Sequence, residues 1–156
     1  MLDYINRKFL INFFLTLIIF FLDRISKIYV ISQSEKNLFD DLYQSKFLNI
    51  SLIWNEGIAF GLFSFDNKLF YNLLTILIVS ITIVIIWLMF KSRGFEKLSF
   101  LMIIGGSFGN IFDRIYYSAV PDFIDLHFNN YHWFIFNVAD IFITLGIIFL
   151  ISIEIF

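Results

Sequence analysis

Ionisable side chains interrupt three of the four long apolar stretches in this 156-residue chain, in each case near one end of the stretch. The interrupting residues are Asp23, the Asp113–Arg114 pair and Asp140. A charge costs about 2.5–3.5 kcal/mol at the centre of a membrane helix and less toward its ends. Carboxyl groups kept at such a cost are candidates for a functional site, and the chemistry open to them is proton transfer.

Other kinds of chemistry have weaker support in the sequence. The chain has no Cys, which excludes disulfides, a cysteine nucleophile and thiolate metal sites. His127 and His132 match no standard zinc spacing such as H-E-x-x-H, so we assign no metal. Ser107 lies in a G-x-S-x-G pattern, but a nucleophile elbow needs a strand–turn–helix context and this stretch is an apolar helix. A serine hydrolase that uses Ser107 with either His is therefore disfavoured.

Two interpretations stay open for the polar residues at the ends of the apolar stretches. Asn110 and Arg114 share a helix face with Asp113 beside it, which fits either a self-satisfied polar network or a set of donors for a substrate backbone. Asn137 is a good helix N-cap and Asp140 stands three residues later, so both residues also suit a helix start. Asp23 is expected mainly to pair with its neighbours along the helix.

Composition then defines the class of protein. Hydrophobic residues make up 60% of the chain, charged residues only 15%, and the mean hydropathy is +0.84. A soluble domain of this size has about 25% charged residues, so a soluble protein, a disordered chain and a basic nucleic-acid binder are nearly excluded. We expect one integral membrane domain, mainly α, over 1–156. Its four transmembrane helices are expected at about 9–30, 69–90, 98–115 and 138–155.

Basic residues near the N-terminus and between the second and third spans place both termini in the cytoplasm by the positive-inside rule. The external segments are then 32–68 and 116–137, and every ionisable residue within a span lies toward the outer face. We expect a small extracytoplasmic β-sheet that includes a strand at 47–54, and a short surface helix within 35–44. No small-residue cleavage site follows the first apolar stretch, so this stretch is expected to stay as a span.

Five short motifs, in order, resemble those of the bacterial lipoprotein signal peptidases, the type II signal peptidases. Each motif alone is weak, but their order and their placement on four spans make the joint match specific. The matching segments are Asp23–Lys27 (D-x-x-[ST]-K), Asn55–Gly61 (N-x-G-x-A-F-[GS], with Glu56 and Ile58 at the free positions), Gly105–Arg114 (G-G-x-x-G-N-x-x-D-R), Val120–Phe123 (V-x-D-F) and Phe136–Asp140 (F-N-x-A-D).

The resemblance implies an intramembrane aspartyl endopeptidase of the bacterial cytoplasmic (inner) membrane, with its active site toward the outer face. Such an enzyme cleaves diacylglyceryl-modified prolipoproteins just before the lipidated cysteine, and two carboxyl groups that share a proton suffice for this chemistry. By resemblance the catalytic pair is Asp122 and Asp140. The substrate-binding positions are Asn55, Asn110, Arg114 and Asn137, and the supporting positions are Asp23, Lys27, Gly57, Phe60 and Asp113.

The resemblance further implies lipid-modified prolipoproteins and membrane lipids as partners, inhibition by the cyclic peptide globomycin, and no metal, cofactor or nucleic acid. We expect a monomer. Asp122 is expected in a mobile external segment that meets Asp140 by loop closure, while Trp54 and Phe60 are expected at the level of the lipid headgroups. A small non-enzymatic transporter or assembly subunit is the alternative, disfavoured because such a protein needs polar residues through the depth of the bundle.

Overall fold

The computed structural model describes residues 2–36, 41–57, 68–129 and 131–155, with four helices and four strands among them. Each helix has a segment that is long and apolar enough to cross a membrane. The elements in chain order are α1 (Leu2–Lys36), β1 (Asp41–Gln44), β2 (Leu48–Asn55), α2 (Lys68–Lys91), α3 (Gly94–Tyr117), β3 (Val120–Phe128), β4 (Tyr131–Phe136) and α4 (Val138–Ile155).

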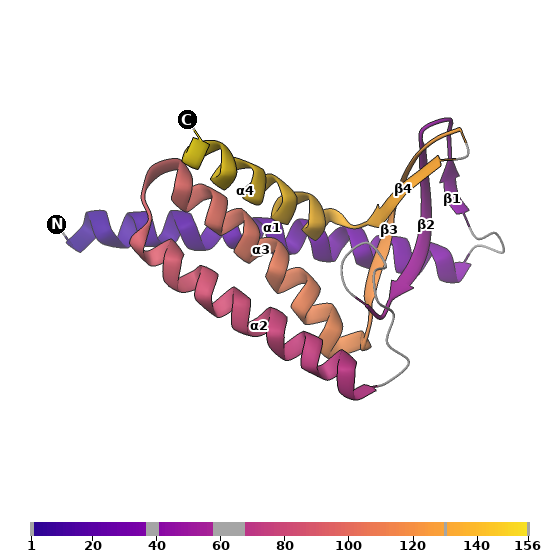
Figure 1. Ribbon diagram of the computed structural model, residues 1–156, viewed down its shortest axis with the longest axis horizontal. Helices are drawn as coiled ribbons and strands as arrows, with labels where there is room; N and C mark the ends of the chain where they lie inside the picture. The colour runs from indigo at the N-terminus through magenta and orange to yellow at the C-terminus, as the bar shows by residue number, and fades with distance from the viewer. Residues whose placement is uncertain (1, 37–40, 58–67, 130, 156) are drawn as a thin grey trace.

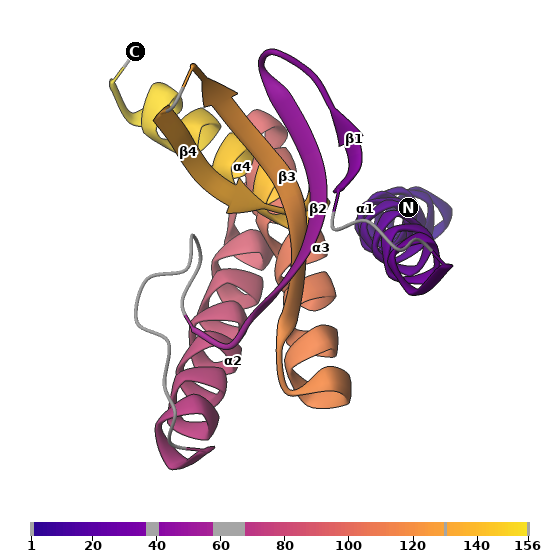
Figure 2. The same ribbon diagram turned by 90° about the vertical axis from the view of Figure 1, so that its right-hand side faces the viewer.

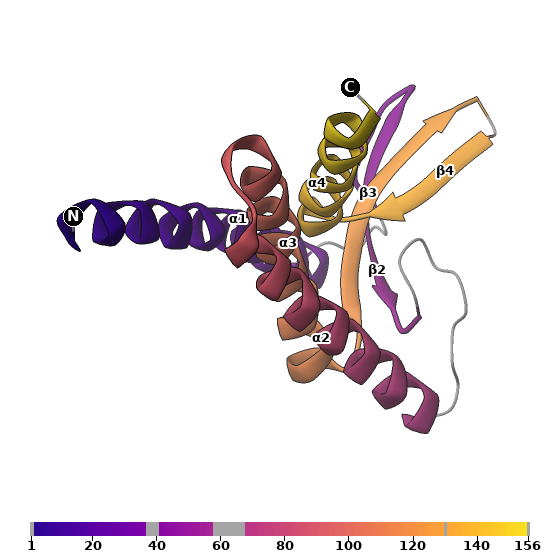
Figure 3. The ribbon, with the colours of Figure 1, turned by 60° about the vertical axis from the view of Figure 1, so that its left-hand side comes forward.

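Helix α3 lies at the centre of the helical part and contacts each of the other three helices (Figure 3). Its glycines allow this close approach, and Gly105 and Gly109 have the G-x-x-x-G spacing typical of closely packed membrane helices. A Cβ at Gly105 would lie 2.8 Å from the Cβ of Ile19 on α1, and one at Gly106 would lie 2.5 Å from the carbonyl oxygen of Ala139 on α4. The stretch that contains the polar residues of α3 is thus the one that holds α1 and α4 together.

The four strands form one antiparallel sheet in the order β1-β2-β3-β4 (Figure 2). Strand β2 confirms the strand predicted at 47–54. The short surface helix predicted within 35–44 is wrong: α1 continues to Lys36, and Asp41–Gln44 is a strand. Tyr43 pairs with Ile50 of β2, so pairing with a neighbouring strand overrides the helical preference of this short segment.

Strands β3 and β4 occupy the segment that we expected to be mobile. Asp122 lies within β3 opposite Ile53 of β2, so its position is set by strand pairing and no loop closure is needed. The two strands form a hairpin, and Asn129 at the turn has a positive φ of 54°. Both strands are rich in β-branched and aromatic residues, a sequence pattern from which strands can be predicted.

The sheet stands at one end of the helical part, and both chain ends lie toward the other end (Figure 1). The turn between α2 and α3, which carries Arg93, is on the side of the termini. Large apolar side chains are exposed along the helices, for example Phe21 at 53% and Ile83 at 61%. Such surfaces suit contact with lipid and not with water. Buried charged and amide side chains, among them Lys27 on α1, Asp122 on β3 and Asn137 at the start of α4, lie where the helices meet the sheet.

Candidate active site

Asn137 connects Asp122 on β3 with Asp140 on α4. Its Nδ2 donates a 2.6 Å hydrogen bond to Oδ1 of Asp122, and its Oδ1 accepts a 3.1 Å bond from the backbone N–H of Asp140. Asn137 is fully buried, and the two aspartates are only 3% and 7% exposed. The side chain of Asn137 thus fixes β3, which carries Asp122, relative to α4, which carries Asp140.

Asn137 and Asp140 also form the N-terminal cap of α4. The backbone N–H of Asn137 donates to Oδ2 of Asp140 at 3.2 Å, which completes the reciprocal bonds of a capping box. Another backbone N–H in the first turn of α4, that of Ala139, donates to Oδ1 of Asp23 at 3.0 Å. The predicted cap at Asn137 is confirmed. It does not compete with a role in the site, because its amide nitrogen remains free for Asp122.

Asn55 and Arg114 place the chain that follows β2 beside Asp122. Nδ2 of Asn55 donates to Oδ2 of Asp122 at 2.8 Å, and its Oδ1 accepts from the backbone N–H of Gly57 at 2.8 Å. Nη2 of Arg114 donates to the carbonyl oxygen of Gly57 at 2.8 Å. Arg114 is buried and does not extend to the membrane surface; among the described residues, its Nε and Nη1 have no hydrogen-bond partner.

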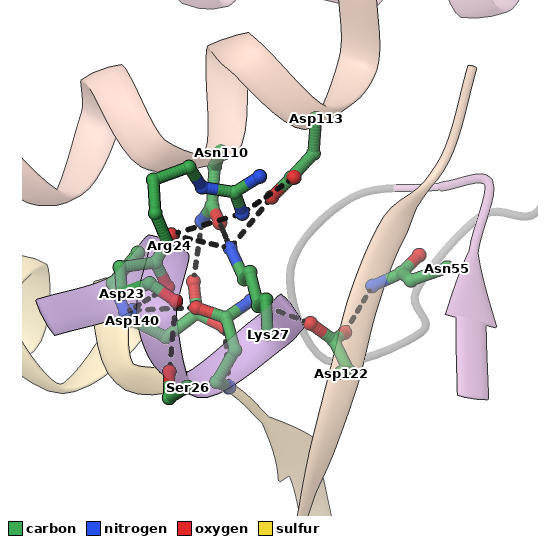
Figure 4. A network of polar contacts seen from close by, with 11 residues as sticks. Asp23, Arg24, Ser26, Lys27, Asn55, Asn110, Asp113, Asp122 and Asp140 are labelled. Atoms are coloured by element: carbon green, nitrogen blue, oxygen red, sulfur yellow. Dashed lines mark hydrogen bonds and ion pairs between the residues drawn. The ribbon is translucent and has the colours of Figure 1, made fainter. Parts of the chain in front are cut away.

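Asn110 connects Asp140 to a buried lysine (Figure 4). Its Nδ2 donates to Oδ1 of Asp140 at 2.8 Å, and its Oδ1 accepts from Nζ of Lys27 at 2.9 Å. Because Lys27 can only donate, it fixes the orientation of the Asn110 amide so that the NH₂ group points to the carboxylate. Lys27 therefore acts on Asp140 through Asn110.

Lys27 belongs to a cluster of four buried charges formed by α1 and α3. Its Nζ lies 2.9 Å from Oδ2 of Asp23 and 2.6 Å from Oδ2 of Asp113. Nη2 of Arg24 lies 3.3 Å from Oδ2 of Asp23 and 2.6 Å from Oδ1 of Asp113. The local pairing predicted for Asp23 is confirmed, and Asp113 extends it to a second helix. The two cations balance the two anions, which is the condition under which buried charges are tolerated.

The pKa of Asp122 is raised to about 6. Burial is the main cause, and the nearby carboxyl group of Asp140 also contributes. The hydrogen bonds from Asn55 and Asn137 act in the opposite direction, because they stabilise the ionised form. A carboxyl group in this condition can hold a proton near neutral pH and release it during a reaction. Two coupled carboxyl groups of this kind are suited to acid–base catalysis.

Two cavities reach Asp140 from different sides. One, of about 400 Å³, lies between α2, α3 and α4; Ile78, Ile81, Ile143 and Ile147 line it together with Asn110, Arg114 and Asp140. The other, of about 430 Å³, lies between the β3–β4 hairpin and α4 and is lined mainly by aromatic and aliphatic side chains. Asp140 thus borders two spaces whose walls are mostly apolar.

The structure brings most of the predicted site residues together. Asp122, Asp140, Asn55, Asn110 and Asn137 form one hydrogen-bonded group. Of the supporting residues, Lys27 bonds to Asn110, and Gly57 bonds to Asn55 and Arg114. Asp23 and Asp113 are connected to this group through Lys27. Phe60 lies outside the described residues. Ser107 is in the middle of α3 and not at a strand–turn–helix junction, which removes the structural basis for a nucleophile elbow. Arg24 was missed as a supporting residue, although it stands beside Asp23 in the first motif.

Comparisons with known proteins agree on one family. The family model for signal peptidase (SPase) II matches residues 15–156. A lipoprotein signal peptidase of Pelagibacter ubique is 51% identical over 150 residues, which are 96% of this chain and 90% of that protein. One from Wigglesworthia glossinidia brevipalpis is 41% identical over 138 residues, covering 85% and 86%. A bacterial membrane enzyme solved by the in meso method at 2.3 Å resolution has a TM-score of 0.75 at 28% identity, covering 92% of this chain and 87% of its own.

Proposed function

The chain belongs to the signal peptidase II family, and from this premise we propose that Asp122 and Asp140 are its catalytic pair. The protein is an aspartic peptidase of the bacterial membrane that removes signal peptides from prolipoproteins. The observation that carries the assignment of the pair is their shared link to Asn137, since this residue bonds to the side chain of Asp122 and to the backbone and side chain of Asp140.

In the proposed mechanism the two carboxyl groups share one proton. We assign this proton to Asp122, and ionised Asp140 takes a proton from water while the water oxygen attacks the scissile carbonyl carbon. Asp122 gives its proton to the carbonyl oxygen. The tetrahedral intermediate then collapses: the C–N bond breaks, the leaving amine takes up the proton held by Asp140, and one hydroxyl group of the intermediate returns its proton to Asp122 as the new carbonyl forms.

We propose that the substrate enters laterally from the bilayer. The cavity between α2, α3 and α4 supports this route, because its isoleucines suit an apolar signal peptide and it ends at Asn110, Arg114 and Asp140. The two buried guanidinium nitrogens of Arg114 that have no partner in the described part of the chain suit a substrate carbonyl. The scissile bond is the one before a diacylglyceryl-modified cysteine, whose acyl chains remain in the membrane.

The test is cleavage by the purified protein in proteoliposomes, with the masses of both products measured. Diacylglyceryl-modified prolipoprotein is expected to give one cut before the modified cysteine, and the unmodified precursor is expected to remain uncut. Globomycin should block the reaction, and Ser107→Ala should leave it intact. A cut elsewhere would contradict the proposed specificity, and loss of cleavage in well-folded Ser107→Ala would bring back the serine mechanism.

We propose that the site and the sheet face outward from the cytoplasmic membrane, with both termini inside. The N-terminal part of α1, which includes Arg7, and the turn between α2 and α3, which includes Arg93, support this, since both lie toward the end away from the sheet (Figure 1). The natural lack of Cys allows a direct test with two single-cysteine variants at exposed positions, Lys46→Cys and Arg93→Cys. An impermeant maleimide should label only Lys46→Cys in intact spheroplasts; the reverse labelling would invert the topology.

Asn137→Ser separates the helix cap from the proposed catalytic role. Serine is also a good N-cap, so α4 should keep its start, but the hydrogen bond to Asp122 is lost. We expect kcat to fall by about tenfold to a hundredfold, while the midpoint of thermal unfolding changes by only a few degrees. A matched substitution is Asn12→Ser, which is on α1 away from the pair and should change neither quantity. Wild-type kcat in Asn137→Ser would show that the amide does not position Asp122.

The raised pKa of Asp122 predicts a falling limb in the pH profile of kcat/KM. In the folded enzyme Asp122 binds its proton more tightly than an ordinary Asp does. Asp122 is therefore protonated below pH of about 6 and loses the proton as pH rises through that value. Asn55→Leu removes a donor that lowers this pKa, so the limb should shift to higher pH. A limb that stays in place or shifts to lower pH would contradict the assignment of Asp122 as the proton carrier.

A further inference from the structure

Three potential metal ligands lie together on the β3–β4 hairpin. His127 and His132 are directly opposite each other across the two strands, and their rings stack with centroids 5.0 Å apart. Nδ1 of His132 is 2.8 Å from Oδ2 of Asp125. One ligand atom from each of the three residues lies within 4.8 Å of the other two. None of the three takes part in the proposed cleavage reaction.

Two buried atoms of this group have no hydrogen-bond partner within the described residues, namely Oδ1 of Asp125 and Nδ1 of His127. Asp125 is only 5% exposed, and a buried polar atom left without a partner costs about 1–3 kcal/mol. The other carboxylate oxygen of Asp125 accepts from His132 and, at 3.5 Å, from Nδ2 of Asn49. A carboxylate oxygen and an imidazole nitrogen that lack hydrogen-bond partners, in the same small group, are atoms of the kinds that a metal cation binds.

The charge balance of Asp125 leads to the same conclusion. The buried carboxylates Asp23 and Asp113 contact both Arg24 and Lys27. Over the described ranges, Asp125 has an ion pair with His132 alone, which is charged only when it is protonated. A carboxylate buried without a fixed positive charge is unfavourable unless it coordinates a metal or becomes neutral.

We propose that Asp125, His127 and His132 bind a divalent transition-metal ion of the Zn²⁺ type. Imidazole nitrogens and a carboxylate oxygen are common zinc ligands, whereas Mg²⁺ and Ca²⁺ prefer oxygen alone. Bonds of about 2.0–2.2 Å at tetrahedral angles place ligand atoms about 3.4 Å apart. The side chain of His132 is 53% exposed and can rotate to close the remaining distance. Water would take the fourth position.

The ligands escape sequence patterns because they come from two strands. Asp125 and His127 are on β3, and His132 follows after the hairpin turn, so no helical H-x-x-x-H spacing arises. Asn49 on β2 is placed to orient the carboxylate by its weak hydrogen bond. A bound ion would join β3 to β4, the hairpin that begins near Asp122 and ends at Phe136, immediately before Asn137.

The test uses the full-length protein in detergent, purified without a polyhistidine tag. Because the chain has only two histidines, histidine labelled with ¹⁵N gives two sets of ring signals, and both should shift on addition of one equivalent of Zn²⁺. Calorimetry should show one saturable Zn²⁺ site per chain, and Zn²⁺ should raise the midpoint of thermal unfolding. Unchanged ring signals at saturating Zn²⁺ would overturn the proposal without any variant.

Variants locate the site. The double variant His127→Gln/His132→Gln should lose the saturable binding, and Asp125→Asn should weaken it at least about tenfold. Asp122→Asn serves as the control that removes a carboxyl group from the proposed catalytic pair, and its Zn²⁺ affinity should equal that of the wild type. Binding that survives in the double variant, or that is lost in Asp122→Asn, would place the ion elsewhere and overturn the proposal.

Discussion

Asp122→Asn and Asp140→Asn are each expected to lower the turnover of lipid-modified prolipoprotein by at least about a thousandfold. Each substitution keeps the size of the side chain but removes a group that must hold or release a proton. A positioned acid or base contributes about 10²–10⁴ in rate, and two groups that act as one unit lose most of the effect together. The double variant should therefore be scarcely slower than either single variant.

The measurement is single-turnover cleavage in proteoliposomes, where slow rates remain visible. Glu154→Gln is the matched control, since it makes the same chemical change at an exposed position on the same helix as Asp140. The variants should also unfold at a temperature close to that of the wild type or higher, because burying an amide costs less than burying a carboxylate. Turnover within tenfold of the wild type in either variant would refute the proposed pair.

Lys27→Met is expected to destabilise the protein by about 3–5 kcal/mol, which is a large part of the stability of a typical domain. Nζ of Lys27 bonds to Asp23, Asp113 and Asn110, and the side chain is fully buried. Methionine fills a similar volume, so the loss comes from electrostatics and not from packing. It leaves two buried carboxylates facing one guanidinium group.

A compensating variant tests this reason. In Lys27→Met/Asp113→Asn the remaining charges are Arg24 and Asp23, so the cluster is neutral again. The double variant should recover at least half of the lost stability in denaturant unfolding or thermal unfolding in detergent. It should recover less of the cleavage activity, because Asn110 is still without the donor that fixes its amide. If the double variant is less stable than Lys27→Met, charge balance does not explain the role of Lys27.

The helices were predictable because their signal is long and repeated. Lys68–Lys91 and Val138–Ile155 are nearly continuous apolar runs, and a membrane leaves few other structures for them. The sheet was predicted only at β2. Strand β1 is short, and β3 pairs with a strand that is distant in the sequence, such as Leu126 opposite Leu48 of β2. The prediction of a short helix within 35–44 was wrong for this reason.

The residues of the proposed site could be named from the sequence, but their connections could not. Motif resemblance indicated Asp122, Asp140 and the three asparagines, and the capping pattern at Asn137 followed from local spacing. That the amide of Asn137 also bonds to Asp122 requires a strand and a helix end to meet, which no local pattern encodes. The same holds for Lys27 and Asp113, which are 86 residues apart, and for the group formed by Asp125 and the two histidines.

The pairing of Lys27 with Asp113 also constrains how the chain enters the membrane during synthesis. When α1 emerges from the ribosome, Arg24 and Lys27 have only the carboxylate of Asp23 nearby, and the end of this helix carries one excess positive charge. The balancing Asp113 arrives with α3, after α2 has been synthesised. We therefore expect the charged end of α1 to stay near the headgroups, where its long side chains can reach water, until α3 docks beside it. Assembly of the site thus depends on the order of synthesis, and a chain that ends before α3 keeps an unburied cation where the active enzyme has a neutral core.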